Sequence, residues 1–194
     1  MNMGGDMAPG NLNPGIIAAA RCGDRAAWEE LYRNLYPRLR AFFARRVGRE
    51  TAEDAVNETM AKAIAGIGTY QPGPSGFDGW VFGIARHVNA DHHRRSARDL
   101  RQHEVAHRVD GHGPESELPV DHELDLRDDH AQLRSLFEKL EPSEQEVLEL
   151  RVIAGLPSEE VAVLLDKTPG AVRTAQSRAL THLRRLLEAD RVGA

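Results

Sequence analysis

Residues 158–187 read SEEVAVLLDKTPGAVRTAQSRALTHLRRLL, a stretch that predicts one helix, a tight turn and a longer second helix. We expect Ser158 to cap the first helix, because its hydroxyl oxygen can accept from the free N–H groups of the opening turn. Thr168 suits the N-cap of the second helix, and Pro169 suits its first position. The order of these elements is typical of a helix-turn-helix.

The second predicted helix has two chemically different faces at about 100° per residue. Its apolar face contains Val172, Ala175, Ala179, Leu180, Leu183, Leu186 and Leu187. Its polar face contains Arg173, Thr174, Ser177, Arg178 and Thr181. Residues 167–185 hold five Lys/Arg and no Asp/Glu, whereas residues 131–166 hold three and eight. A DNA-reading helix needs such a cationic face, although an amphipathic hairpin with a solvated basic face gives the same pattern.

The composition limits the classes of protein to consider. The chain has 194 residues and a formal net charge of −5, so any contact with nucleic acid must be local. No apolar run approaches the ~18–20 residues of a membrane span, so no membrane insertion is expected. Residues 1–13 are interpreted as a disordered leader that lacks the features of a secretory signal, and a cytoplasmic location is expected. The single cysteine, Cys22, excludes an internal disulfide.

The chain divides into helical and non-helical parts. Strand-like alternation is nearly absent, and residues 14–95 and 131–190 have helical patterns. Residues 96–130 hold four Lys/Arg and ten Asp/Glu with few large apolar groups, which is typical of a linker. The predicted fold is therefore all-α, with two small helical domains joined by a flexible acidic linker. Ser143 and Glu146 are expected to form a capping box at a helix start in the second domain.

Apolar spacing predicts three helices in the first domain. They cover residues 25–47, 51–67 and 80–95, with a Gly- and Pro-rich loop before the third. Pro37 is expected to kink or split the first of these helices. Thr51 and Asp54 resemble a capping box at the start of the second, with Asp in place of Glu.

Three segments together resemble one protein family. They are AEDAVNETMAKAI (52–64), FDGWVFGIARHVNADHHRR (77–95) and the stretch 140–187, which contains the helix-turn-helix. Their order and spacing, with the acidic linker between, resemble the extracytoplasmic-function (ECF) sigma factors of bacterial RNA polymerase. The resemblance covers about residues 16–188. It implies that the chain directs core polymerase to specific promoters and has no enzymatic activity, and no cofactor is expected.

The resemblance implies three binding surfaces. Asp54, Asn57 and Glu58 would dock on the clamp of the largest polymerase subunit, although a solvated acidic face is the other interpretation. The residues implied at the minus-10 element are Arg86, His87, Asp91, Arg94 and Arg95. Many relatives have Asn at the position of His87, which leaves the minus-10 base preference open. The residues implied at the minus-35 element are Thr168, Arg173, Thr174, Ser177 and Arg178.

Further partners follow from the resemblance. The second domain would contact the flap of the second-largest polymerase subunit, and an anti-sigma factor is expected to hold the chain inactive. Gln176 departs from the aliphatic residue of many relatives, and is expected to be either partly exposed or hydrogen-bonded inside. A stand-alone helix-turn-helix regulator remains the alternative, separable because it binds DNA tightly without polymerase.

One motif points to different chemistry. Residues His103-Glu104-Val105-Ala106-His107 match the H-E-x-x-H pattern, in which two histidines bind zinc and the glutamate activates water. The motif lies in the polar predicted linker, which has little apolar sequence to build a rigid, dry site. We therefore interpret it as a chance match and predict no metal site.

Overall fold

The computed structural model describes residues 13–106 and 132–193, without the side chains of residues 49–50, 97, 99–106 and 192–193. Every regular element in this part of the chain is helical, so the all-α prediction is confirmed there. The elements are α1 (Pro14–Arg21), α2 (Arg25–Arg46), α3 (Arg49–Gly66), η1 (Ile67–Thr69), α4 (Gly76–Ala106), α6 (Pro142–Leu148), η2 (Glu149–Ile153), α7 (Ser158–Leu164) and α8 (Pro169–Gly193). Residues 132–138 are also helical.

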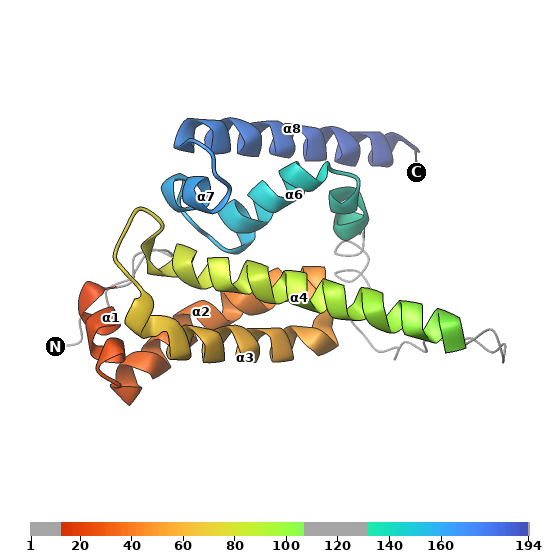
Figure 1. Ribbon diagram of the computed structural model, residues 1–194. Coiled ribbons are helices and arrows are strands. Elements are labelled where there is room, and N and C mark those ends of the chain that lie inside the picture. The colour runs from red at the N-terminus through yellow and green to blue at the C-terminus, as the bar shows by residue number, and fades with distance from the viewer. Residues whose placement is uncertain (1–12, 107–131, 194) are drawn as a thin grey trace, which may run out of the picture.

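Helices α2, α3 and α4 form the N-terminal bundle (Figure 1). Leu31, Leu35 and Leu39 repeat at one-turn spacing on α2 and are fully buried. Phe42 extends this stripe and meets Phe82 of α4 edge to face, with ring centroids 5.7 Å apart. The apolar stripe of α2 therefore builds the centre of the bundle.

Helix α2 runs through Pro37 without a break, so the predicted split is wrong. Pro37 is exposed, and water can therefore reach the carbonyl group that loses its intrahelical partner. Burial of the leucine stripe on both sides of Pro37 offsets the local cost of the proline.

The predicted helix starts need three corrections. Helix α3 begins at Arg49 after Gly48, whose φ of 84° suits glycine, so Thr51 lies inside the helix and caps nothing. In α6 the capping glutamate is Glu144, whose side chain accepts from the backbone N–H of Glu141 at 3.2 Å. Ser158 is the first residue of α7 and donates its hydroxyl to Glu159 instead of capping the helix. The N-cap positions of α3 and α7 are Gly48 and Pro157, and neither makes a side-chain capping bond.

Helix α4 is longer at both ends than the sequence pattern predicts. It begins at Gly76 and continues past Arg95 to Ala106, into the segment whose composition predicts a linker. Residues 103–106 form the last turn of this helix. The side chains of the H-E-x-x-H motif, and His107 itself, lie outside the described residues.

Helices α7 and α8 form the predicted helix-turn-helix. The turn contains Asp166 at φ 52°, and the hydroxyl oxygen of Thr168 accepts from the N–H of Ala171 at 3.2 Å. Thr168 therefore caps α8 as expected, and Pro169 is its first residue. On the predicted apolar face Val172 is fully buried, whereas Leu180 is 42% exposed and does not belong to the core.

The C-terminal helices pack directly on the N-terminal bundle. In Figure 1, α6, α7 and α8 lie on one side of α4 and α3 lies on the other. Helix α7 contacts α4, and η2 contacts α2. One continuous hydrophobic core includes Phe82 from the first half and Val161 and Leu156 from the second. None of the described helices has the length and apolar character needed to cross a membrane.

Candidate nucleic-acid and protein-binding surfaces

The outer face of α8 carries the residues that sequence analysis selects for the minus-35 element. Arg173, Thr174, Ser177 and Arg178 are all exposed. The guanidinium of Arg173 lies 3.1 Å from the hydroxyl of Ser158 and 3.5 Å from a carboxylate oxygen of Glu159, which steadies it above α7. This face therefore presents hydroxyl and guanidinium donors on a helix whose other side is fixed in the core.

Gln176 connects α8 to η2. Its side-chain oxygen accepts from Nε of Arg151 at 2.9 Å, and Arg151 also donates to the carbonyl of Leu156. Gln176 is half-buried, so it is both partly exposed and hydrogen-bonded. The amide thus fixes α8 against η2 and lies outside the exposed polar arc of the helix.

The residues selected for the minus-10 element lie along α4. His87, Arg94 and Arg95 are exposed, whereas Arg86 and Asp91 are half-buried. A ring nitrogen of His87 lies 2.8 Å from the carbonyl oxygen of Gly83, one turn earlier on the same helix. Asp91 pairs with Arg94, and this hydrogen bond holds the pKa of Asp91 below its usual value.

The three residues of α3 predicted to bind polymerase separate into two groups. Asp54 and Asn57 are exposed. Glu58 turns toward α4 and lies 2.8 Å from Lys62 and 3.6 Å from Arg95. The hydrogen bond with Lys62 lowers the pKa of Glu58, so the carboxylate stays ionised beside these cations. Glu58 therefore belongs to the ion-pair network with α4 and not to the exposed pair.

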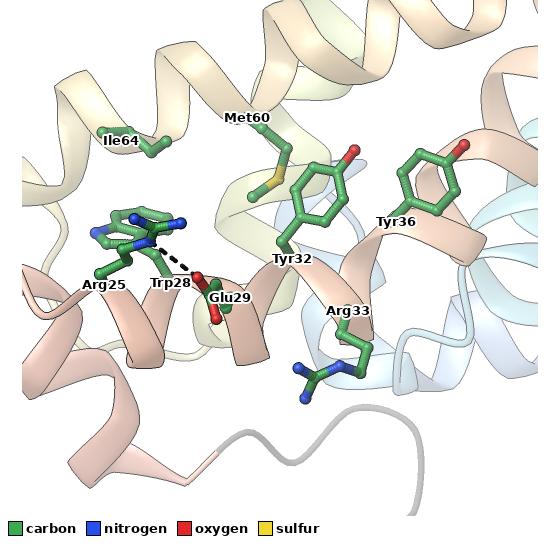
Figure 2. Close-up of a pocket in the computed structure, with 8 residues that line it drawn as sticks. All are labelled: Arg25, Trp28, Glu29, Tyr32, Arg33, Tyr36, Met60 and Ile64. Atoms are coloured by element: carbon green, nitrogen blue, oxygen red, sulfur yellow. Dashed lines mark hydrogen bonds and ion pairs between the residues drawn. The ribbon is translucent and has the colours of Figure 1, made fainter.

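An aromatic groove lies between α2 and α3 (Figure 2). It has a volume of about 640 Å³ and is lined mainly by Trp28, Tyr32, Tyr36, Met60 and Ile64. The rings of the two tyrosines stack with centroids 5.3 Å apart. Tyr32 is 38% and Ile64 51% exposed, and three charged residues, Arg25, Glu29 and Arg33, also line the groove.

Sequence analysis did not select this groove. The signal was present: Trp28, Tyr32 and Tyr36 recur every four residues, one position after the aliphatic stripe that begins at Leu31. Two adjacent stripes on one helix indicate that its apolar arc is wider than the core requires.

The two halves match separate family models. Residues 31–99 match the model described as Sigma-70 region 2, and residues 130–183 match Sigma-70, region 4. The ECF RNA polymerase sigma factor ShbA of Streptomyces griseus is 31% identical over 179 residues, which cover 89% of this chain and 94% of ShbA. The chain belongs to the ECF sigma factor family. Sigma factors are non-catalytic initiation factors that direct RNA polymerase to promoters.

Further comparisons agree with this family. The ECF RNA polymerase sigma factor BldN of Streptomyces coelicolor is 32% identical over 90% of this chain, which spans 66% of the length of BldN. The structure of the sigma factor RpoE from Bartonella quintana, in complex with the anti-sigma factor NepR, has a TM-score of 0.61 at 24% identity. It covers 84% of this sigma factor and 98% of the RpoE chain, and it supports the fold.

In this sigma factor, Arg86 of region 2 is held by region 4. Its Nε and one terminal nitrogen donate to the same carboxylate oxygen of Glu146, at 3.1 and 2.7 Å. The other terminal nitrogen donates to the carbonyl of Leu164 at 2.6 Å. All three nitrogen atoms of the guanidinium therefore have partners in region 4.

Glu160 of α7 reaches the first turn of α4. One carboxylate oxygen accepts from the backbone N–H of Gly79 at 3.0 Å, and the residue is only 7% exposed. Burial raises the pKa of Glu160 to about 7, with a further contribution from the charge of Asp78. The Gly79 N–H and Arg38 oppose this rise without cancelling it.

Two arginines of α2 complete the contact between the regions. Nε of Arg38 donates to the carbonyl of Ala154 at 2.6 Å, and its terminal nitrogen pairs with Asp78. Nε of Arg46 donates to Glu149 at 2.7 Å. Burial raises the pKa of Glu149 despite this attraction, because desolvation outweighs the charge of Arg46. The contact thus contains carboxylates that are costly to remove from water.

Proposed function

We propose that this sigma factor directs core RNA polymerase to promoters through region 4 at the minus-35 element and region 2 at the minus-10 element. One observation carries the proposal: the polar arc of α8 is exposed while Val172 and Ala179, on its other side, are completely buried. A recognition helix fixed in this way can enter the major groove with its hydroxyl and guanidinium groups toward the bases.

The polymerase-binding surface is assigned to α3. Exposed Asp54 and Asn57 provide acceptors for a basic clamp helix, and the adjacent aromatic groove provides apolar area beside them. Glu58 is assigned an indirect role, because its ion pairs orient Arg95 and Lys62. Asp54 and Asn57 beside an apolar groove suit a partner whose contact surface is basic at its edge and apolar at its centre.

Domain limits and location are part of the same proposal. Residues 14–95 and 131–190 act as the two functional units, and residues 96–130 connect them on the polymerase. The polymerase supplies all the chemistry, so the chain itself catalyses no reaction, and it acts in the cytoplasm, where polymerase and promoters are. Because RpoE of Bartonella quintana is found with an anti-sigma factor, we extend such a partner to this chain.

Run-off transcription with core polymerase and a promoter library tests the proposal. We expect selective initiation with the full chain and its loss in Asp54→Lys, whereas Glu30→Lys, the same charge change at an exposed site on α2, keeps it. A pull-down with core polymerase should give the same order. Tight, specific DNA binding without polymerase and no initiation would instead identify a stand-alone regulator.

A further inference from the structure

Region 4 contacts Arg86, one of the residues implied at the minus-10 element, and also the first turn of the same helix. Glu146 binds Arg86, the half-buried cation of α4, and Glu160 binds the free N–H at the first turn of that helix. A guanidinium and a helix N-terminus are the groups that bind phosphate in nucleic-acid complexes. The two carboxylates therefore lie where DNA phosphates would be expected.

We propose that region 4 is an intramolecular competitor of minus-10 DNA, and that Glu146 and Glu160 hold a closed form which must open before region 2 binds a promoter. The inference rests on the proposed function, in which region 2 binds the minus-10 element. The closed form itself is a separate claim about how the two regions contact each other.

The surface of α4 is shaped for α7. A Cβ atom added at Gly79 would lie 3.2 and 3.3 Å from atoms of Glu160, and one added at Gly83 would lie 3.4 Å from Leu164. The approach at Gly79 is tighter than an ordinary contact, and at Gly83 a Cβ atom would just touch Leu164, so only a side chain longer than alanine would push the helices apart there. The contact is therefore built by both regions and does not consist of a few chance side-chain pairs.

The closed form leaves one DNA-binding surface free. The polar arc of α8 remains exposed, whereas Arg86 has partners at all three nitrogens. Closure therefore blocks the contact with opened, single-stranded DNA and spares the contact with duplex. Opening exposes part of the shared apolar core, and the buried carboxylates offset some of this cost because they recover their hydration when the regions separate.

Distance measurement by double electron–electron resonance tests the closed form without DNA. Cys22 is the only cysteine of the chain and is exposed, and Ala189→Cys adds a second exposed label site on α8. We expect a narrow distance distribution for the parent chain. Glu146→Gln and Gly83→Leu should each shift it to longer, broader distances, the first by loss of the ion pair and the second by wedging α4 from α7.

Matched controls separate opening from unfolding. Glu188→Gln removes one exposed carboxylate on α8, and Gly68→Leu adds a side chain where no atom lies within 4 Å; neither should change the distances. Leucine favours helix more than glycine does, so Gly83→Leu should leave region 2 folded, as circular dichroism will report. Unchanged distances in both test variants, or a broad distribution in the parent chain, would overturn the proposal.

Binding of a fluorescein-labelled single-stranded DNA of mixed sequence, followed by anisotropy, tests the competition. We expect Glu146→Gln to bind about two- to tenfold more tightly than Glu188→Gln, as release of a partly exposed ion pair allows. Equal affinities together with longer distances would refute competition while leaving the closed form intact. Longer distances without initiation from any promoter would refute the proposed function alone.

Discussion

Glu160 is the residue whose charge is most sensitive to the contact between the regions. It faces Gly79 and Asp78 of α4, Arg38 of α2 and its own neighbour Glu159, and it raises the pKa of nearby Tyr70. Only Arg38 among these groups carries a positive charge, and Arg38 is already paired with Asp78. Glu160 therefore keeps a proton more readily in the closed form than in water.

The direction of the pH dependence follows from this pKa. The pKa of Glu160 rises from 4.5 to about 7 on closure, so its contribution to closure is complete below pH 4.5 and is lost as pH rises through 7. The full difference corresponds to ~3 kcal/mol. We expect the fraction of molecules in the closed form, as measured by the spin-label distances, to be larger at pH 6 than at pH 8.

Glu160→Gln supplies the control for this pH dependence. The amide oxygen still accepts from Gly79, and the side chain no longer titrates between pH 4.5 and 8, so most of the dependence should disappear. Glu149, whose pKa burial also raises, should supply the remainder in the same direction. A closed population that grows with rising pH would contradict the assignment of the effect to Glu160.

Arg178 is the residue of α8 best suited to read a base. It is exposed in the middle of the polar arc, with Ser177 beside it and Thr181 one turn further on. If it makes a bidentate contact with guanine, Arg178→Ala should weaken initiation by ~1–3 kcal/mol. Run-off rates against Arg191→Ala, an exposed arginine at the far end of the helix, measure the effect. Parent-level activity would remove Arg178 from the base-reading set.

At the scale of elements, the start of α8 depends on one hydroxyl group. Thr168 caps the helix through the N–H of Ala171. Thr168→Ala should therefore lower the free energy of unfolding by ~1 kcal/mol, whereas Thr168→Ser keeps the cap and should cost little. Urea unfolding measures both variants. Equal stability of the alanine and serine variants would show that the cap contributes nothing.

The sequence predicted the interiors of helices better than their ends. Periodic apolar residues located α2, α3 and α8 closely, because a stripe such as Leu31, Leu35 and Leu39 has few other interpretations. Helix starts failed where several cap residues stand together. In Glu141-Pro142-Ser143-Glu144 the proline fixes the first helical turn one residue before the serine, which moves the capping role to Glu141 and Glu144.

The surface of α8 was predictable and the contact between the regions was not. Exposure of Arg173 and Arg178 follows from helical periodicity within one segment. The pairing of Arg86 with Glu146 joins residues 60 positions apart, and Arg46 with Glu149 joins residues 103 apart. No local pattern signals such pairs, because either arginine has an equally good interpretation as a solvated or DNA-binding cation.

For the whole molecule, the continuous core predicts cooperative unfolding. Val161 and Leu156 belong to the same core as Phe82, so neither half can lose its packing without exposing part of the other. We expect one calorimetric transition for the parent chain, with calorimetric and van't Hoff enthalpies in agreement. Gly83→Leu should divide it into two. Two resolved transitions in the parent chain would contradict a shared core.

The matched arginines of α2 and α4 have a consequence for the engineering of new regulators. Arg38, Arg46 and Arg86 find their acceptors on the facing surface of region 4 in the same chain. A hybrid that takes its entire C-terminal half from a relative would lack these matched acceptors. We expect such a hybrid to show a higher basal level of transcription when no signal is present. Grafting only the outward side chains of α8 would change which promoter is recognised. It would keep the contacts between the regions and therefore the closed form.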